Sequence, residues 1–143
     1  MRRSSGAETR GRVLVVDDEG MILDLLRIVL EGAGYTVATA ASADALPEVL
    51  RAEAPDVVVI DLGLPGLPGD QAVRTIRREI GDGGLPVILY SGEDEGELRE
   101  RARSSGADAV VAKTSPTMAL LEAIEHAMEA AGRSVALAAA GER

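Results

Sequence analysis

The chain has 143 residues and no cysteine, which predicts a single domain and excludes disulfides and thiolate metal sites. Its 15 basic and 24 acidic residues give a net charge of −9, which argues against direct nucleic-acid binding, because phosphate contacts need clustered Lys and Arg. No apolar run approaches the roughly 18 residues of a membrane helix, so we expect a cytoplasmic protein with no membrane contact.

The first third of the chain predicts a leader, two strands and a helix between them. Residues 1–11 are rich in Arg, Ser and Gly and are expected to be disordered. Residues 12–16 form a short, continuous, β-branched run, typical of a strand buried on both faces. A more alternating run at 35–39 suits an edge strand. The helix between them has apolar residues at helical spacing, Ile22, Leu25, Leu26, Val29 and Leu30, and is expected to end at Gly32 and Gly34.

The middle third predicts two more strands, each preceded by a helix. Ser42 is expected to cap a helix that Pro55 stops, and Pro47 inside it predicts that this helix is short or starts late. Strands are predicted at 56–60 and 86–90. The helix between these strands places four apolar residues on one face, Ala72, Val73, Ile76 and Ile80.

The last third predicts a polar helix, a fifth strand and a final helix. Leu98 and Ala102 are the best buried candidates in the helix over residues 94–106, and residues 109–112 are the strand. The final helix is expected to have Ser115 as its cap, Pro116 in its first turn and Gly132 at its end. Its apolar stripe contains Leu120, Leu121, Ile124, Ala127 and Met128. The domain is therefore expected to span residues 12–131, followed by a flexible tail at 132–143.

Strands alternate with helices five times, which predicts an α/β fold with a parallel sheet covered on both faces. Right-handed crossovers restrict this pattern to a doubly wound sheet. In such sheets the functional crevice lies at the carboxyl ends of the strands, where the strand order reverses.

Polar side chains follow four of the five predicted strands. Asp17 and Asp18 follow the first, Asp61 the third, Ser91 the fourth and Lys113 the fifth. Because parallel strands end at one edge of the sheet, these groups are expected to converge there. Each acid could alone be a helix cap or turn residue, but the combination predicts a shared site.

Close carboxylates repel each other, and a hard divalent cation removes that conflict. The sequence predicts Mg2+ held by Asp17, Asp18 and Asp61, with the backbone carbonyl of Gly63 as a further ligand. A carboxylate beside a metal and a lysine is a place where a phosphoryl group can be accepted. Asp61 is the expected nucleophile, and Lys113 and Ser91 are expected to contact the phosphoryl oxygens.

Four segments, in order and at the family's spacing, resemble the receiver domain of two-component response regulators: "VLVVDDE", "PDVVVIDLGLPGLPGD", "LPVILYSGEDE" and "SGADAVVAK". The resemblance covers roughly residues 11–131. It implies a flavodoxin-like (βα)5 sheet in the order 2-1-3-4-5. It also implies that a sensor histidine kinase or phosphotransfer protein is the phosphoryl donor and that an unknown downstream effector protein receives the signal.

This sequence departs from the family pattern at three positions. Val110 replaces the aromatic residue usual before the lysine, so the family's hydroxyl-to-aromatic switch lacks one half. Thr114 follows Lys113 where the family has a cis proline, so either a strained cis bond persists or the lysine approaches differently. Gly92 stands where alanine is usual and keeps phosphate access open.

The leading interpretation is a stand-alone signalling receiver that is not an enzyme and acts through a phosphorylation-dependent protein surface, with homodimerisation left open. Two alternatives remain. One is a pseudo-receiver that is never phosphorylated; the intact set of acids argues against it, and Val110 and the missing Lys–Pro bond leave it open. The other is a Mg2+-dependent phosphohydrolase, against which Gly63 counts, because such enzymes often carry a second acid at that position.

Overall fold

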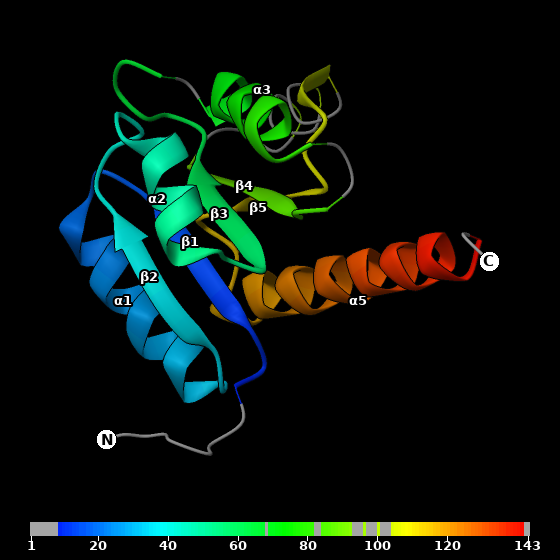
Figure 1. The fold of residues 1–143 in the computed structure, drawn as a ribbon. Coiled ribbons are helices and arrows are strands. Elements are labelled where there is room, and N and C mark those ends of the chain that lie inside the picture. The colour runs from blue at the N-terminus through cyan, green and yellow to red at the C-terminus, as the bar shows by residue number, and fades with distance from the viewer. Residues whose placement is uncertain are drawn as a thin grey trace.

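The computed structural model describes residues 9–67, 69–81, 84–92, 96, 100 and 104–141. For residues 69, 70 and 133–141 it describes the backbone alone. Its five strands form one parallel sheet in the order β2-β1-β3-β4-β5 (Figure 1). This confirms the predicted flavodoxin-like order 2-1-3-4-5. The strands are β1 (Arg12–Val16), β2 (Thr36–Ala40), β3 (Val57–Asp61), β4 (Val87–Ser91) and β5 (Ala109–Ala112). The helices whose two ends lie within the described residues are α1 (Gly20–Gly32), α2 (Leu46–Glu53), α3 (Gly69–Ile80) and α5 (Thr117–Gly141).

The sheet separates two aliphatic cores, because successive side chains of a strand point to opposite faces. Leu14, Val58 and Leu89 belong to the core shared with α2 and α3. Val13 and Ile88 belong to the core shared with α1 and α5. The three central strands β1, β3 and β4 are therefore buried on both faces, and this explains why their sequences read as continuous apolar runs rather than alternating ones. The edge strands β2 and β5 are only partly buried.

Three predictions for helices α1, α2 and α3 are wrong in detail. Ser42 does not cap helix α2, which begins after Ala45; the short, late-starting helix that Pro47 predicted is confirmed, and Pro47 lies in its first turn, where a missing N–H costs least. Leu25 and Ile80 were expected on buried stripes, but they are 44% and 43% exposed. The predicted helix over 94–106, with Leu98, Ala102 and the three arginines Arg99, Arg101 and Arg103, lies largely outside the described residues.

Helix α5 is longer than the sequence predicts. It begins at Thr117, directly after Pro116, and its Leu120 and Ile124 are buried against the sheet as expected. The helix does not end at Gly132 but continues to Gly141, so its last turns extend beyond the sheet (Figure 1). Within the described part of the chain, no helix combines the length and apolar character needed to cross a membrane.

Candidate functional site

The carboxyl ends of the strands bring the predicted polar residues to one edge of the sheet. Asp17 follows β1, and its backbone N–H donates to the carbonyl of Ala40 at the end of β2. Asp61 is the last residue of β3 and is in register with Tyr90 of β4. Ser91 ends β4, and its carbonyl accepts a hydrogen bond from the N–H of Lys113 at 2.7 Å.

Lys113 reaches into this edge and contacts three carboxylates. Its Nζ lies 2.8 Å from Asp17 Oδ2 and 3.6 Å from Asp61 Oδ2. The same atom lies 3.4 Å from Glu19 Oε1. Among the described residues no peptide bond is cis, so the Lys113–Thr114 bond is trans. The lysine therefore reaches both acids without the cis bond that the family resemblance implies.

Asp17, Asp18 and Asp61 form an acidic cluster whose ligand atoms all lie within 4.8 Å of one another. Asp17 and Asp61 are buried, at 1% and 8% exposure, whereas Asp18 is exposed to solvent. Asp17 Oδ1 accepts from the N–H of Glu19 at 2.9 Å, and Asp61 Oδ1 accepts from the N–H of Gly63 at 3.0 Å. One carboxylate oxygen of Asp17 and one of Asp61 is thus fixed by a backbone N–H. The other oxygen of each acid faces Lys113.

The residues of the cluster fit a magnesium ion. Asp17 Oδ2 is fully buried and accepts no hydrogen bond in the described part of the chain, although Lys113 faces it as an ion partner. All three ligands are hard carboxylate oxygens, the donor type that Mg2+ prefers over nitrogen and sulfur. The N–H of Gly63 is engaged by Asp61, and its carbonyl as a metal ligand stays a prediction.

The electrostatics of the site reflect three acids held close to one amine. Burial raises the pKa of Asp61, and the charges of Asp17 and Asp18 add to this, while the Gly63 N–H and Lys113 oppose it. Burial alone lowers the pKa of Lys113, but the contact with Asp17 and the charge of Asp61 outweigh it and raise that pKa. The amine is therefore a permanent cation at neutral pH, and the site still carries excess negative charge.

Sequence reasoning placed Ser91 correctly and passed over two residues. Ser91 is buried at 2% exposure at the end of β4, beside Asp61 of the neighbouring strand. Glu19, which follows Asp18, contacts Lys113. Tyr90 belongs to β4, and Lys113 lies over its ring. Its position directly before Ser91, at the end of a strand, was the available signal.

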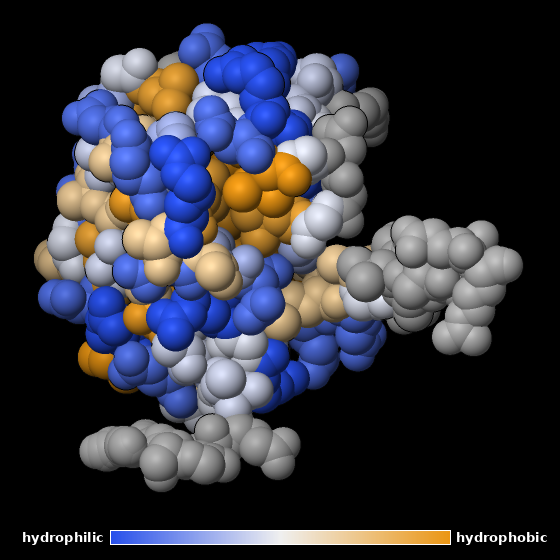
Figure 2. Space-filling model, viewed as in Figure 1, coloured by the Kyte–Doolittle hydropathy of each residue, from blue (hydrophilic) through white to orange (hydrophobic). Residues whose placement is uncertain are grey.

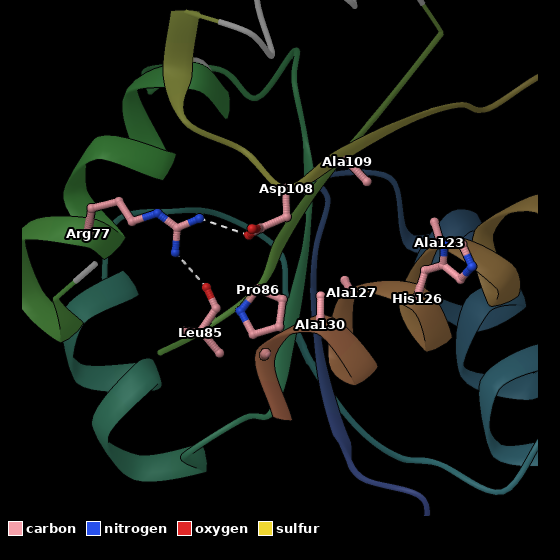
Figure 3. A pocket seen from close by; sticks show the side chains of 10 residues that line it. Arg77, Leu85, Pro86, Asp108, Ala109, Ala123, His126, Ala127 and Ala130 are labelled. Carbon is pink, nitrogen blue, oxygen red and sulfur yellow. Dashed lines mark hydrogen bonds and ion pairs between the residues drawn. The ribbon is translucent and has the colours of Figure 1, made fainter. Parts of the chain in front are cut away.

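The hollow shown in Figure 3 lies at the opposite, amino edge of the sheet. It measures about 500 Å3 and is lined by residues that precede or begin β4 and β5, including Leu85, Pro86 and Asp108, and by the α5 residue His126. Arg77 points across it to Asp108 and the carbonyl of Leu85 (Figure 3). Figure 2 shows hydrophobic surface between α3 and the exposed length of α5. None of the acids of the cluster lines this hollow.

Comparison with known proteins identifies the family of this chain. Residues 13–125 match the family described as response regulator receiver domain. This chain belongs to that family. A receiver domain from Methanospirillum hungatei, described as CheY-like, superposes with a TM-score of 0.77 at 28% identity, covering 86% of this chain and 97% of that one.

Curated relatives of this receiver domain are larger regulators. The probable transcriptional regulatory protein TcrX of Mycobacterium tuberculosis is 34% identical over 113 residues, which is 79% of this chain and 47% of the relative. The phosphate regulon transcriptional regulatory protein PhoB of Klebsiella pneumoniae is 32% identical over 117 residues, 82% of this chain and 51% of the relative. The chain therefore spans about half the length of these relatives.

Proposed function

We propose that this receiver domain accepts a phosphoryl group on Asp61 from a phosphohistidine of a sensor histidine kinase or phosphotransfer protein. The observation that carries the proposal is the placement of Asp61 at the end of β3, with Lys113 Nζ 3.6 Å from its Oδ2 and Asp17 beside it. A nucleophile, a cation and a second acid at one edge of the sheet are the groups that transfer of a phosphoryl group requires.

The transfer step exchanges one bond to phosphorus for another. A carboxylate oxygen of Asp61 forms the new P–O bond, and the P–N bond of the donor histidine breaks with its electron pair returning to the imidazole nitrogen. Lys113 would neutralise charge on the transferred group, and the Ser91 hydroxyl would donate a hydrogen bond to one of its oxygens. Asp17, Asp18, Asp61 and the Gly63 carbonyl would hold Mg2+, which supplies positive charge against the phosphoryl oxygens when bound.

The raised pKa of Asp61 bears directly on this step, because only the ionised carboxylate is a nucleophile. A cation beside Asp61 favours the ionised form. The ammonium of Lys113 already acts in this direction, and a bound metal would do so more strongly. The site therefore needs its cation for the nucleophile as well as for the transferred group.

Phosphorylation of Asp61 would transmit the signal by shifting a two-state equilibrium that changes a protein-binding surface, and an effector protein would recognise that surface. The names of the larger relatives describe transcriptional regulators, and DNA binding is not carried over to this acidic chain. The cytoplasmic location and the homodimer stay predictions.

The test is to incubate the protein with Mg2+ and acetyl phosphate, a small phosphoryl donor, and to follow its intact mass. We expect a labile single phosphoryl adduct on the wild type and none on Asp61→Asn. Asp24→Asn, the same change on an exposed α1 residue outside the cluster, should be labelled like the wild type.

Three results would contradict the proposal. An adduct of equal size on Asp61→Asn would move the acceptor to another residue. Absence of any adduct on the wild type would favour a pseudo-receiver, to which Val110 and the Lys113–Thr114 bond already point. Continuous hydrolysis of many phosphate esters would favour a phosphohydrolase.

A further inference from the structure

The single lysine of the chain lies over one of its two tyrosines. Lys113 is the only lysine in the sequence, and Tyr35 and Tyr90 are the only aromatic residues apart from one histidine. The Nζ atom of Lys113 is 5.8 Å from the centre of the Tyr90 ring, above its face. An ammonium in this position is attracted by the ring quadrupole, within the roughly 6 Å limit of that interaction.

The ring of Tyr90 is fixed by the core in which it packs. Tyr90 is only 4% exposed and belongs to the core between the sheet and helices α1 and α5, together with Leu120 and Ile124. Its backbone is in register with Asp61 on one side and Val111 on the other. A buried ring in the middle of a sheet has little freedom to move, so it offers Lys113 a fixed surface.

Lys113 contacts carboxylates at two depths while it lies over the ring. Asp17 lies at the buried end of the site, at 2% side-chain exposure, and Glu19 lies at the rim, at 63% exposure. The ammonium is nearer to Asp17 Oδ2, at 2.8 Å, than to Glu19 Oε1, at 3.4 Å. A long lysine side chain can turn outward into water at little cost, and the attraction of the Tyr90 ring is lost when it does so.

The aromatic group of this site therefore comes from β4 and not from β5. Val110, at the β5 position where the family usually has an aromatic residue, packs against the core on the α2 and α3 face. Tyr90 packs on the α1 and α5 face. The two positions lie on opposite sides of the sheet, so Tyr90 does not fill the space of the missing ring. It takes a different role.

We propose that Tyr90 is a positioning residue that holds the Lys113 ammonium inside the site, against Asp17 and Asp61. The part that concerns phosphoryl transfer rests on the proposed function of Asp61, whereas the placement of Lys113 does not. Tyr90 touches neither the phosphoryl group nor its donor in this scheme. It acts through the lysine alone.

The experiment uses the fact that the chain has one lysine. Protein grown on 13C,15N-lysine gives one set of side-chain NMR signals, which report the surroundings of Lys113. We expect the ε-methylene protons to be shifted upfield by the ring current of Tyr90 in the wild type and in Tyr90→Phe. In Tyr90→Leu the signal should move toward that of free lysine. Tyr90→Met gives the same comparison if the leucine variant does not fold.

Tyr35→Leu is the matched control, because Tyr35 belongs to the same core and pairs with Arg10 rather than with Lys113. It should leave the Lys113 signal in place. The proposal is wrong if Tyr90→Leu leaves the ε-methylene shift unchanged. It is also wrong if Tyr35→Leu moves that shift as far, because the effect would then report only loss of packing.

A second measurement links position to chemistry. The rate of Asp61 phosphorylation by acetyl phosphate at saturating Mg2+ should fall about two- to fivefold in Tyr90→Leu and stay unchanged in Tyr90→Phe, as expected for a cation–ring contact of ordinary strength. An unchanged rate in Tyr90→Leu would overturn the catalytic part of the proposal. If the wild type itself forms no adduct, the proposed function fails, and the NMR comparison still tests the placement of Lys113.

Discussion

Asp61 is a buried carboxylate whose surroundings favour its neutral form. Its folded-state pKa lies above the ordinary value of 3.8, because burial and then the charges of Asp17 and Asp18 outweigh the help from Gly63 and Lys113. The folded state therefore binds a proton at Asp61 more readily than the unfolded chain does. This contribution to stability is fully present below pH 3.8 and is lost as the pH rises through the folded pKa.

It follows that the Asp61 carboxylate destabilises the metal-free protein at neutral pH. We expect Asp61→Asn to raise the free energy of unfolding in EDTA at pH 7 by about 1 kcal/mol, the usual scale of single substitutions. The gain should shrink as the pH is lowered toward 3.8. Urea unfolding at several pH values measures it.

Asp18→Asn is the control for this measurement. Asp18 is exposed, and its charge is the last of the influences on Asp61, so a smaller gain is expected. A loss of stability in Asp61→Asn at pH 7 would show that the carboxylate makes a net favourable interaction with Lys113, contrary to this account.

The residues of the cluster could be predicted because strand direction alone decides where they lie. Asp17, Asp18, Asp61 and Lys113 each follow a strand, and parallel strands end together. The roles of Glu19 and Tyr90 depend on where one long, flexible side chain settles. The position of Tyr90 directly before Ser91 indicates that it lies at this edge of the sheet, but no sequence pattern shows that Lys113 settles over its ring.

At the scale of elements, Arg77 connects helix α3 to the amino edge of the sheet. Its guanidinium donates to the carbonyls of Leu85 and Gly106 and to the carboxylate of Asp108. Asp108 Oδ2 also accepts from the N–H of Val87, at 2.8 Å. The side chain of Arg77 is only 16% exposed, and its bond to Leu85 is partly buried, whereas Gly106 and Asp108 lie at the surface.

We expect Arg77→Ala to lower the free energy of unfolding by about 1–3 kcal/mol, because it removes the guanidinium donor from two carbonyls and one of two donors from the Asp108 carboxylate. Arg78→Ala, one residue further on the exposed face of the same helix, should change stability by less than about 0.5 kcal/mol. Chemical denaturation compares the two. Equal effects would mean that the contacts of Arg77 contribute nothing beyond an ordinary surface arginine.

Gly132 gives a second prediction about an element. Because α5 continues to Gly141, Gly132 lies in a helix interior, and a Cβ added there meets no atom within 4 Å. Gly132→Ala should therefore stabilise the protein by about 0.5–1 kcal/mol and raise its helical circular dichroism. If Gly132 instead ended the helix, as the sequence suggested, alanine would destabilise it.

The elements show where local patterns suffice and where they do not. The bounds of all five predicted strands agree with the structure to within one residue, because short runs of aliphatic residues mark the strands in the sequence. The start of α2 was misplaced because Ser42 is a good cap in isolation, whereas Pro47 is best placed in a first turn. Leu25 and Ile80 were assigned to buried faces because helical spacing does not say how wide the covered face is.

At the scale of the whole molecule, the acidic cluster lies at the ends of β1 and β3. These neighbouring strands contribute side chains to both cores. A cation held by Asp17 after β1 and by Asp61 at the end of β3 would link neighbouring strands at the centre of the sheet. Any ligand that binds only the folded state stabilises all of it. The cluster should therefore affect global and not only local stability.

We expect Mg2+ to raise the unfolding temperature of the wild type and EDTA to reverse the change. At a hundredfold excess over its Kd the ion should add about 2.7 kcal/mol. Asp17→Asn should lose most of this gain, and Asp24→Asn, on the exposed face of α1, should keep it. Thermal scans at increasing Mg2+ provide the test, and a gain in Asp17→Asn equal to that of the wild type would place the ion elsewhere.

The direction of the strands has a practical consequence for experiments on this receiver domain. Residue Arg12 begins β1 and helix α5 runs back along the sheet, so both ends of the described chain leave from the edge opposite the acids (Figure 1). An affinity tag, a dye or a sensor-chip linkage at either terminus would therefore leave the edge that carries Asp17, Asp18 and Asp61 open to the proposed phosphoryl donor. Immobilised kinetics could then be measured without blocking the docking approach.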